Sequence, residues 1–343
     1  MASTLRDVAR LADVSIKTVS NVIHDYPHVR PAMRERVQAA IEELGYRPNM
    51  SARGLRSGRT GVIGLAVPSL RENYFAELAD SVIRAADSRG LSVVVEQTGG
   101  ERERELEVLG DKRARLTDGL LFSPAALGQG DLPKLHTSFP LVLLGERIFG
   151  GPTDHVTMHN TSSARAAVEH LIDIGRRRIA VIGADQQDGD GASSATLRVA
   201  GYLQALEGAG YPVDPELIRD GAHWSRATGA ESIRELLRTG VAFDAVFALN
   251  DSLGLGALRA LGEAGLRSPD DVAVIGFDNI DEAQFTIPSM SSVDVGRDQI
   301  ATDAVEMLIE RIEDKEPGRR PRVAKPDYRI VRRESTGFPA HER

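Results

Sequence analysis

Residues 4–23 read TLRDVARLADVSIKTVSNVI, and their apolar spacing predicts two short helices joined by a tight turn. The first helix is expected over residues 4–12, where Thr4 is followed three residues later by Asp7 in the pattern of a capping box. The second is expected over residues 15–23, with its apolar residues on one face. Two helices separated by so short a turn are typical of a helix-turn-helix.

A third helix, expected over residues 30–44, completes a small bundle. Met33, Val37 and Ile41 form one apolar stripe along it, and Gly45 follows its last turn as a terminator. The sequence therefore predicts an all-α helix-turn-helix domain at this end of the chain.

Beyond residue 61, short apolar runs alternate with amphipathic helices. The runs lie at 62–67, 91–95, 119–122, 141–144, 179–182, 245–249 and 272–277. The helices are expected at 75–89, 101–116, 162–174, 195–209, 227–238, 253–264 and 297–312. This alternation is typical of parallel sheets covered by helices on both faces, and its length favours two doubly wound lobes.

Charge is distributed unevenly along the 343 residues, whose net charge is −8. Residues 1–60 hold ten Lys and Arg against six Asp and Glu, whereas the remainder holds 32 against 44. The asymmetry is what a small basic module joined to an acidic body would give, but charge alone does not distinguish this from chance clustering.

The polar face of the second helix is a candidate for reading DNA. Lys17, Ser20, Asn21 and His24 share this face, and Ile16 stands at its start. In a helix-turn-helix such a face enters the major groove, where Lys can donate to guanine and Asn can pair with adenine. A solvated helix surface would show the same pattern.

Residues 47–60 place four arginines around the apolar Leu55. The segment fits a plain linker, and it also fits a short hinge helix that binds the minor groove. In the second case Leu55 would wedge between base steps while the arginines hold phosphates.

These segments resemble the LacI/GalR family of bacterial transcription regulators. The resemblance rests on TLRDVA at 4–9, VSIKTVS at 14–20, LGYRPN at 44–49, ARGL at 52–55, ND at 250–251 and GFD at 276–278. It covers essentially the whole chain and implies a homodimer that binds double-stranded operator DNA and answers to a small effector, usually a sugar.

The resemblance also implies the domain organisation. The helix-turn-helix domain would occupy residues 1–46, the hinge 47–60, and a two-lobed periplasmic-binding-protein-like α/β core 61–343. Lobe one would comprise about 61–160 and 292–320, and lobe two about 161–291 and 321–335.

Site residues follow from the resemblance, position by position. DNA contacts are expected from Thr4, Ser15, Ile16, Lys17, Thr18, Ser20, Asn21, His28, Asn49, Ala52, Arg53, Leu55 and Arg56. Effector contacts are expected from Tyr74, Phe75, Glu146, Arg198, Trp224, Asn250 and Asp278. Two departures from the family pattern are Glu72-Asn73 before the aromatic pair and Gly145-Glu146 after the fourth strand.

Chemistry independent of the resemblance supports an effector cleft. Doubly wound sheets bind ligands at the carboxyl ends of their strands, and polar residues follow the apolar runs here. They are Ser69, Ser123, Glu146, Arg147, Asp185, Asn250 and Asp278. Carboxylates, an Arg and a flat aromatic ring suit a hydroxyl-rich ligand better than a purine.

We therefore expect a DNA-binding regulator, most simply a repressor of carbohydrate-utilisation genes. Two alternatives remain at this stage: a solute-binding protein for sugar transport, and an enzyme of carbohydrate metabolism.

The chain has no Cys, Walker loop, dinucleotide fingerprint or metal cluster, so we expect no enzyme activity and no cofactor. With no apolar stretch of membrane length and no signal-like N-terminus, we expect a cytoplasmic protein at the bacterial nucleoid.

Overall fold

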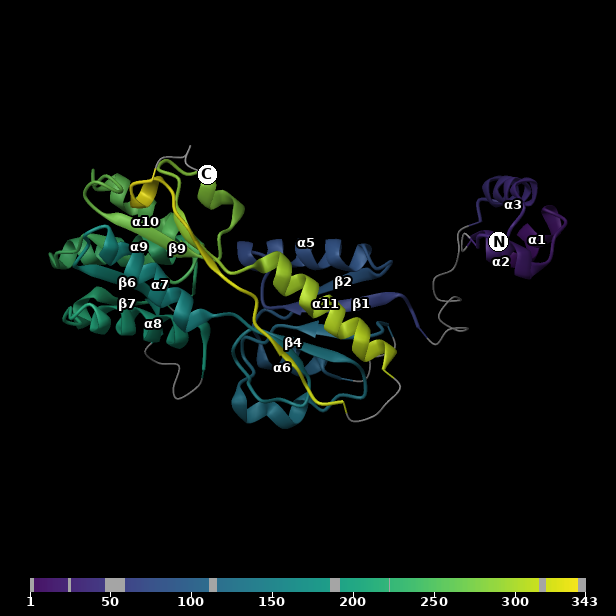
Figure 1. Cartoon of the computed structure of the whole chain (residues 1–343), viewed down its shortest axis with the longest axis horizontal. Coiled ribbons are helices and arrows are strands. Elements are labelled where there is room, and N and C mark those ends of the chain that lie inside the picture. The colour runs from purple at the N-terminus through teal and green to yellow at the C-terminus, as the bar shows by residue number, and fades with distance from the viewer. Residues whose placement is uncertain are drawn as a thin grey trace. The chain divides into compact units, whose positions relative to one another are not determined.

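The computed structural model describes residues 3–23, 26–46, 59–110, 116–185, 192–221, 223–314 and 319–338. The chain divides into two compact units, Met1–Gly61 and Val62–Arg343 (Figure 1). Of the expected DNA-contacting residues, Asn49, Ala52, Arg53, Leu55 and Arg56 lie outside the described residues, and so does His24.

The first unit contains the three expected helices. They are α1 (Leu5–Leu11), α2 (Ile16–Ile23) and α3 (Pro31–Glu43). The capping box is confirmed, since Thr4 Oγ1 accepts from the Asp7 amide and the Asp7 carboxylate accepts from the Thr4 amide. Ser15 accepts from the Thr18 amide at the start of α2. The intervening turn places Asp13 in the left-handed region, at φ 50°.

The core of this unit is small and aliphatic. Val8, Val19 and Val37, one from each helix, are fully buried. Alanines and Tyr46 fill the space around them. The side chains that do not enter this core are left to solvent, and this exposes the polar face of α2.

The second unit contains two six-stranded sheets with the same internal order. Lobe one has β1 (Val62–Val67), β2 (Ser92–Gln97), β3 (Leu120–Phe122), β4 (Leu141–Leu144), β5 (Asp154–Val156) and β11 (Val323–Ala324). Their order is β11-β5-β4-β3-β1-β2, and every pair is parallel.

Alternation along these strands divides the side chains between two faces. Ile63, Leu65 and Leu121 point to one face, where α5 (Asn73–Asp87) and α11 (Arg297–Glu313) pack together. Leu120 and Phe122 point to the other, beneath α6 (Arg102–Val108) and the short 3-10 helix η2 (Gln129–Leu135).

Lobe two repeats the scheme. Its strands are β6 (Ile179–Ala184), β7 (Ile218–Asp220), β8 (Ala245–Ala248), β9 (Ala273–Phe277), β10 (Ser291–Asp294) and β12 (Arg329–Val331), in the order β12-β10-β9-β8-β6-β7. Its helices are α7 (Asn160–Asp173), α8 (Ser194–Gly208), α9 (Arg226–Thr239) and α10 (Asp251–Glu263), with the 3-10 turns η3 (Pro215–Leu217), η4 (Asp281–Gln284) and η5 (Glu334–Thr336).

The α7–α8 and α9–α10 pairs cover opposite faces of the sheet (Figure 1). The edge pair β10–β12 is antiparallel, so the expectation of purely parallel sheets needs this one correction.

The chain passes between the lobes near residues 157–159, 295–296 and 325–328. We expected lobe one to resume at about 292 and lobe two at about 321, and both crossings lie a few residues later. The reason is that β10 pairs with β9 in lobe two, and β11 pairs with β5 in lobe one. Both strands are short, and β10 is rich in Ser, so neither forms an apolar run.

None of the described helices is both long enough and apolar enough to span a lipid bilayer.

Two glycines let α9 and α10 pack at close range. A Cβ atom on Gly256 would overlap the carbonyl oxygen of Arg226, and one on Gly229 would overlap the backbone of Leu253. Gly262, on the same helix as Gly256, has open space around it. The contact between the two helices therefore depends on both Gly229 and Gly256, whereas Gly262 contributes nothing to it.

We expect Gly256→Ala to lower the free energy of unfolding by about 1–3 kcal/mol or more, because the helices must separate to admit the methyl group. The matched variant Gly262→Ala should raise it by up to about 1 kcal/mol, since Ala favours the helix over Gly. Urea unfolding of both variants measures the contrast. Equal effects would contradict the close packing.

Candidate functional site

A cleft of about 860 Å³ lies between the two lobes of the second unit. Its walls come from the segments that follow the carboxyl ends of the strands, as doubly wound sheets require. The polar residues predicted from this pattern all line it: Ser69, Ser123, Glu146, Arg147, Asp185, Asn250 and Asp278. So do the other predicted effector residues, Tyr74, Phe75, Arg198 and Trp224.

Arg198 is the centre of the lobe-two wall. Its side chain on α8 is 3% exposed, and its Nε donates to Asn160 Oδ1 at 2.7 Å. One terminal nitrogen donates to the Leu249 carbonyl, and the other lies 3.6 Å from Asp278 Oδ1. The guanidinium also stacks 3.6 Å from the centre of the Phe277 ring. These contacts fix a buried cation in one orientation beside the cleft.

Asp278 stands on a strained turn. Its φ is 105° and that of Asn279 is 50°, both in the region that favours glycine. The buried Asp251 carboxylate holds the turn by accepting from the Ile280 amide at 2.8 Å and from Ser292 Oγ at 2.7 Å. Ser292 Oγ in turn accepts from the Asn279 amide at 3.0 Å.

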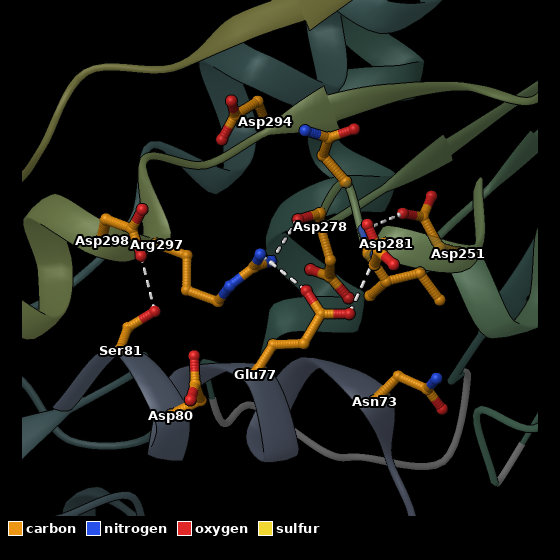
Figure 2. A network of polar contacts seen from close by, with 12 residues as sticks. Asn73, Glu77, Asp80, Ser81, Asp251, Asp278, Asp281, Asp294, Arg297 and Asp298 are labelled. Atoms are coloured by element: carbon orange, nitrogen blue, oxygen red, sulfur yellow. Dashed lines mark hydrogen bonds and ion pairs between the residues drawn. The ribbon is translucent and has the colours of Figure 1, made fainter. Parts of the chain in front are cut away.

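Lobe one also holds this turn (Figure 2). Arg297, the first residue of α11, donates to the Asp278 carbonyl at 3.2 Å and pairs with Glu77 of α5 at 2.6 Å. Figure 2 shows the Glu77 carboxylate between Arg297 and Asp281, whose amide donates to it at 2.9 Å. The turn that presents Asp278 to the cleft is thus held by both lobes.

Burial sets the protonation of the acidic groups. It raises the pKa of Asp278 to about 7, against the opposing effect of Arg198 and Arg297. It also raises the pKa of Asp251 well above its usual range, and the charge of Asp278 adds to that effect. Near neutral pH, Asp278 therefore exchanges between a carboxylate that accepts hydrogen bonds and a carboxyl group that can donate one.

The aromatic and amide side chains are also positioned by the fold. Trp224 Nε1 donates to the Gly183 carbonyl at 2.8 Å, which fixes the indole at the cleft wall. Tyr74 and Phe75 meet edge to face, with centroids 5.2 Å apart. Asn250 Oδ1 caps α10 by accepting from the Leu253 amide at 2.9 Å. The Asn250 NH2 group is then the part that a ligand can use.

The first unit presents the predicted DNA-reading face. Lys17 is exposed, and Ile16 is 37% exposed although it is apolar. Ser20, Asn21 and Thr18 are partly exposed on the same helix. Thr4, Ser15 and His28 are exposed outside it, and Thr4 and Ser15 also act as caps.

Comparisons with known proteins agree with this architecture. The family model described as bacterial regulatory proteins, lacI family, matches residues 4–49, and that of a periplasmic binding protein-like domain matches residues 168–336. A ribose operon repressor from Escherichia coli K12 is 33% identical over 315 residues, which are 90% of this chain and 93% of the repressor. The chain belongs to the lacI family of bacterial regulatory proteins.

Two solved structures extend the comparison. The Lac repressor dimer bound to operator and the anti-inducer ONPF has a TM-score of 0.80 and 27% identity, and covers 98% of this chain and 99% of its own. The regulator CelR in complex with cellobiose has a TM-score of 0.70 and 32% identity, and covers 97% of this chain and 99% of its own. The lacI-family fold inferred from the sequence is confirmed.

Two residues that line the cleft of this lacI-family protein, and two that hold the Asp278 turn behind it, escaped the sequence analysis. Thr157 follows β5, a strand of three residues with no apolar run, and Ser194 begins α8. Arg297 and Glu77 act through contacts between segments far apart in the chain. A polar residue after a recognisable strand is a local signal, whereas these four have none.

The raised pKa of Asp278 predicts a pH dependence of stability. An unfolded Asp releases its proton near pH 4, whereas the folded protein keeps it until about pH 7. This group therefore stabilises the fold below about pH 4, and that contribution is lost as the pH rises to about 7.

Asp278→Asn lacks this titration. We expect the variant to be more stable at pH 8 than at pH 5 when its free energy of unfolding is compared with that of the unaltered protein. The reason is that only the unaltered protein loses the contribution of Asp278 as the pH rises. Urea unfolding at both pH values measures the difference. A difference that does not change with pH would show that Asp278 titrates normally.

Proposed function

We propose that this protein is a sequence-specific transcriptional regulator, a repressor of carbohydrate-utilisation genes, that binds a palindromic operator as a homodimer. A sugar-like effector bound between the lobes controls it, and it acts on chromosomal DNA in the cytoplasm without catalysing a reaction. One observation carries the proposal: the same chain combines a helix-turn-helix and a cleft whose buried Arg198 and Asp278 face an aromatic wall.

The DNA-binding part rests on α2. Lys17 can donate to guanine, Asn21 can pair with adenine, and the exposed Ile16 can contact a thymine methyl. Thr4, Ser15 and His28 are exposed near the ends of these helices and are proposed to contact the backbone. The Lac repressor, which has the same fold, is bound to operator in its structure.

The effector part rests on the chemistry of the cleft. Sugars present hydroxyl edges and an apolar ring face, which suit the Asp278 carboxylate, the Asn250 NH2 group and the Trp224 ring. Cellobiose is bound to CelR, and the name of the ribose operon repressor points to a sugar as well. We propose that Arg198, Asp278 and Asn250 hold hydroxyl groups while Trp224 stacks on the ring, with Tyr74 and Phe75 at the entrance and Glu146 on the facing wall.

Dimerisation is supported by apolar side chains left in solvent. Ile287 is 99% exposed and Phe285 is 73% exposed in lobe two, and Val94 and Ile83 are about half exposed in lobe one. We propose that a second copy of the chain covers some of them. The Lac repressor structure contains a dimer.

Coupling between effector and DNA is proposed to begin at the Asp278 turn. A ligand shifts an equilibrium between two states only by its different affinity for each. Arg297 and Glu77 of lobe one contact this turn. A ligand that hydrogen-bonds to Asp278 therefore stabilises one arrangement of the two lobes over another.

The first test concerns DNA. Operators selected from random DNA should be pseudo-palindromic, and Lys17→Ala should weaken their binding about tenfold or more, since one base contact contributes about 1–3 kcal/mol. The control Lys134→Ala removes an exposed lysine of η2 and should leave affinity unchanged. Fluorescence anisotropy at two salt concentrations measures both. Selected sites without symmetry, or equal affinities, would contradict the proposal.

The second test concerns the response. Asp278→Ala should bind operator as the unaltered protein does, yet show no change when sugar is added, because a lost bond to a buried charged group removes roughly 1.5–3 kcal/mol of the effector's binding free energy. Calorimetry with sugars and repeated operator titrations measure both properties. A variant that still binds sugar and still responds would place the effector elsewhere.

A further inference from the structure

The C-terminal segment, residues 332–338, is fixed to the sheet of lobe two by buried hydroxyl groups. Ser335 is fully buried and Thr336 is 3% exposed, although both are polar. Ser335 Oγ donates to the Val274 carbonyl of β9 at 2.6 Å and accepts from the Ser291 amide of β10 at 2.8 Å. Thr336 Oγ1 lies 2.7 Å from Ser291 Oγ. Because these buried groups are satisfied by one another, the segment has a defined place on the sheet.

Arg333 reaches from this segment to the turn that carries Asp278. Its Nη2 donates to Asn279 Oδ1 at 2.7 Å, and its Nη1 donates to the Met290 carbonyl at 2.6 Å. Its own amide donates to Ser291 Oγ at 2.7 Å, which fixes the base of the side chain. A guanidinium presents its donors in a rigid fork, so it holds its two acceptors in one relative position.

The turn requires such support. Asp278 and Asn279 both have positive φ values, and a strained backbone of this kind persists only when its surroundings determine it. Asp251 and Arg297 hold backbone atoms of the turn, whereas Arg333 holds the Asn279 side chain. The C-terminal segment therefore contributes a support of a different kind from the two already described.

Arg333 also differs from Arg297 in the lobe to which it belongs. Arg297 begins α11 in lobe one, so its bond to the Asp278 carbonyl crosses between the lobes and depends on their arrangement. Arg333, Asn279 and Met290 all belong to lobe two. Their contacts move with that lobe and act equally in every arrangement of the two.

We propose that Arg333 is a positioning residue for the effector: by holding Asn279, it keeps Asp278 directed to the cleft in whichever arrangement the lobes adopt. The inference rests on the proposed function, since it concerns the support of the same site. It assigns to the C-terminal segment a role in effector affinity, and it leaves the coupling between effector and DNA to contacts that cross between the lobes.

Hydrogen exchange of the ligand-free protein tests whether Arg333 holds the turn. The amides of residues 279–281 donate to three side chains outside the turn, so their exchange reports its opening. Arg333→Met removes the donors, and Asn279→Gly removes the acceptor while suiting the backbone at φ 50°. We expect both variants to exchange these amides about tenfold faster, with β8 exchanging as in the unaltered protein.

The double variant and a matched control sharpen this test. Arg333→Met combined with Asn279→Gly should exchange the turn as either single variant does, because both break one bond. Arg332→Met removes the neighbouring exposed cation, which stacks on Phe338, and should change nothing at the turn. Unchanged exchange at the turn, multiplied effects in the double variant, or equal acceleration in β8 overturns the proposal, the last because it indicates a general loss of stability.

Sugar and operator titrations test what the turn does for the effector, with ribose and cellobiose as probes. We expect both single variants to bind the sugar at least about threefold more weakly, because the sugar must then order the turn itself. At saturating sugar, the change in operator affinity should keep its parental size, because both arrangements of the lobes lose the same contribution. Parental sugar affinity, or a smaller change at saturation, overturns the proposal.

The outcomes also separate this inference from the proposed function. If neither sugar binds the unaltered protein, the proposed effector class fails, and exchange without ligand still decides whether Arg333 holds the turn. If the variants bind sugar more weakly but sugar never alters operator affinity in the unaltered protein, the positioning role stands and the regulatory function fails.

Discussion

A buried guanidinium determines the arrangement of lobe two around the cleft. Arg198 is only 3% exposed, so its charge needs partners, and three different segments supply them: two hydrogen-bond acceptors and one carboxylate. Asn160 begins α7, Leu249 ends the run before α10, and Asp278 follows β9. One side chain therefore ties together the positions from which the other polar groups of the wall project.

Two buried glutamates in lobe one show how differently the fold can treat the same residue. The Glu105 carboxylate accepts from the backbone amides of Ala125, Ala126 and Leu127, at distances from 2.7 to 3.1 Å. It is fully satisfied and shapes the loop after β3. Glu146 is similarly buried but has one oxygen directed to no described partner. The first carboxylate holds a loop through both of its oxygens, whereas only Oε2 of the second has a hydrogen-bond partner among the described residues, Ser194 Oγ.

The sequence was informative wherever the signal was local. The helix-turn-helix, the strands 62–67 and 141–144 and the polar residues that follow the apolar runs were predicted correctly, because each depends on neighbours in the chain. The strands β5, β7, β10 and β12 were not, because three or four residues with Ser, Arg or Asp among them form no apolar run, and neither was β11, which has only two residues. The strained turn at Asp278 also gave no signal, since its cause is the distant Asp251 and Ser292.

The order of the segments has a consequence for synthesis of the chain. Lobe one begins at Val62 but receives α11 and β11 only from residues 297–324, and lobe two receives β12 from residues 329–331. Neither sheet can be completed on the ribosome until almost the entire polypeptide has emerged. The nascent chain must therefore carry two incomplete sheets with open edges, a condition that favours aggregation. The three helices of the N-terminal unit lie within residues 5–43 and pack on one another, so this unit can fold long before.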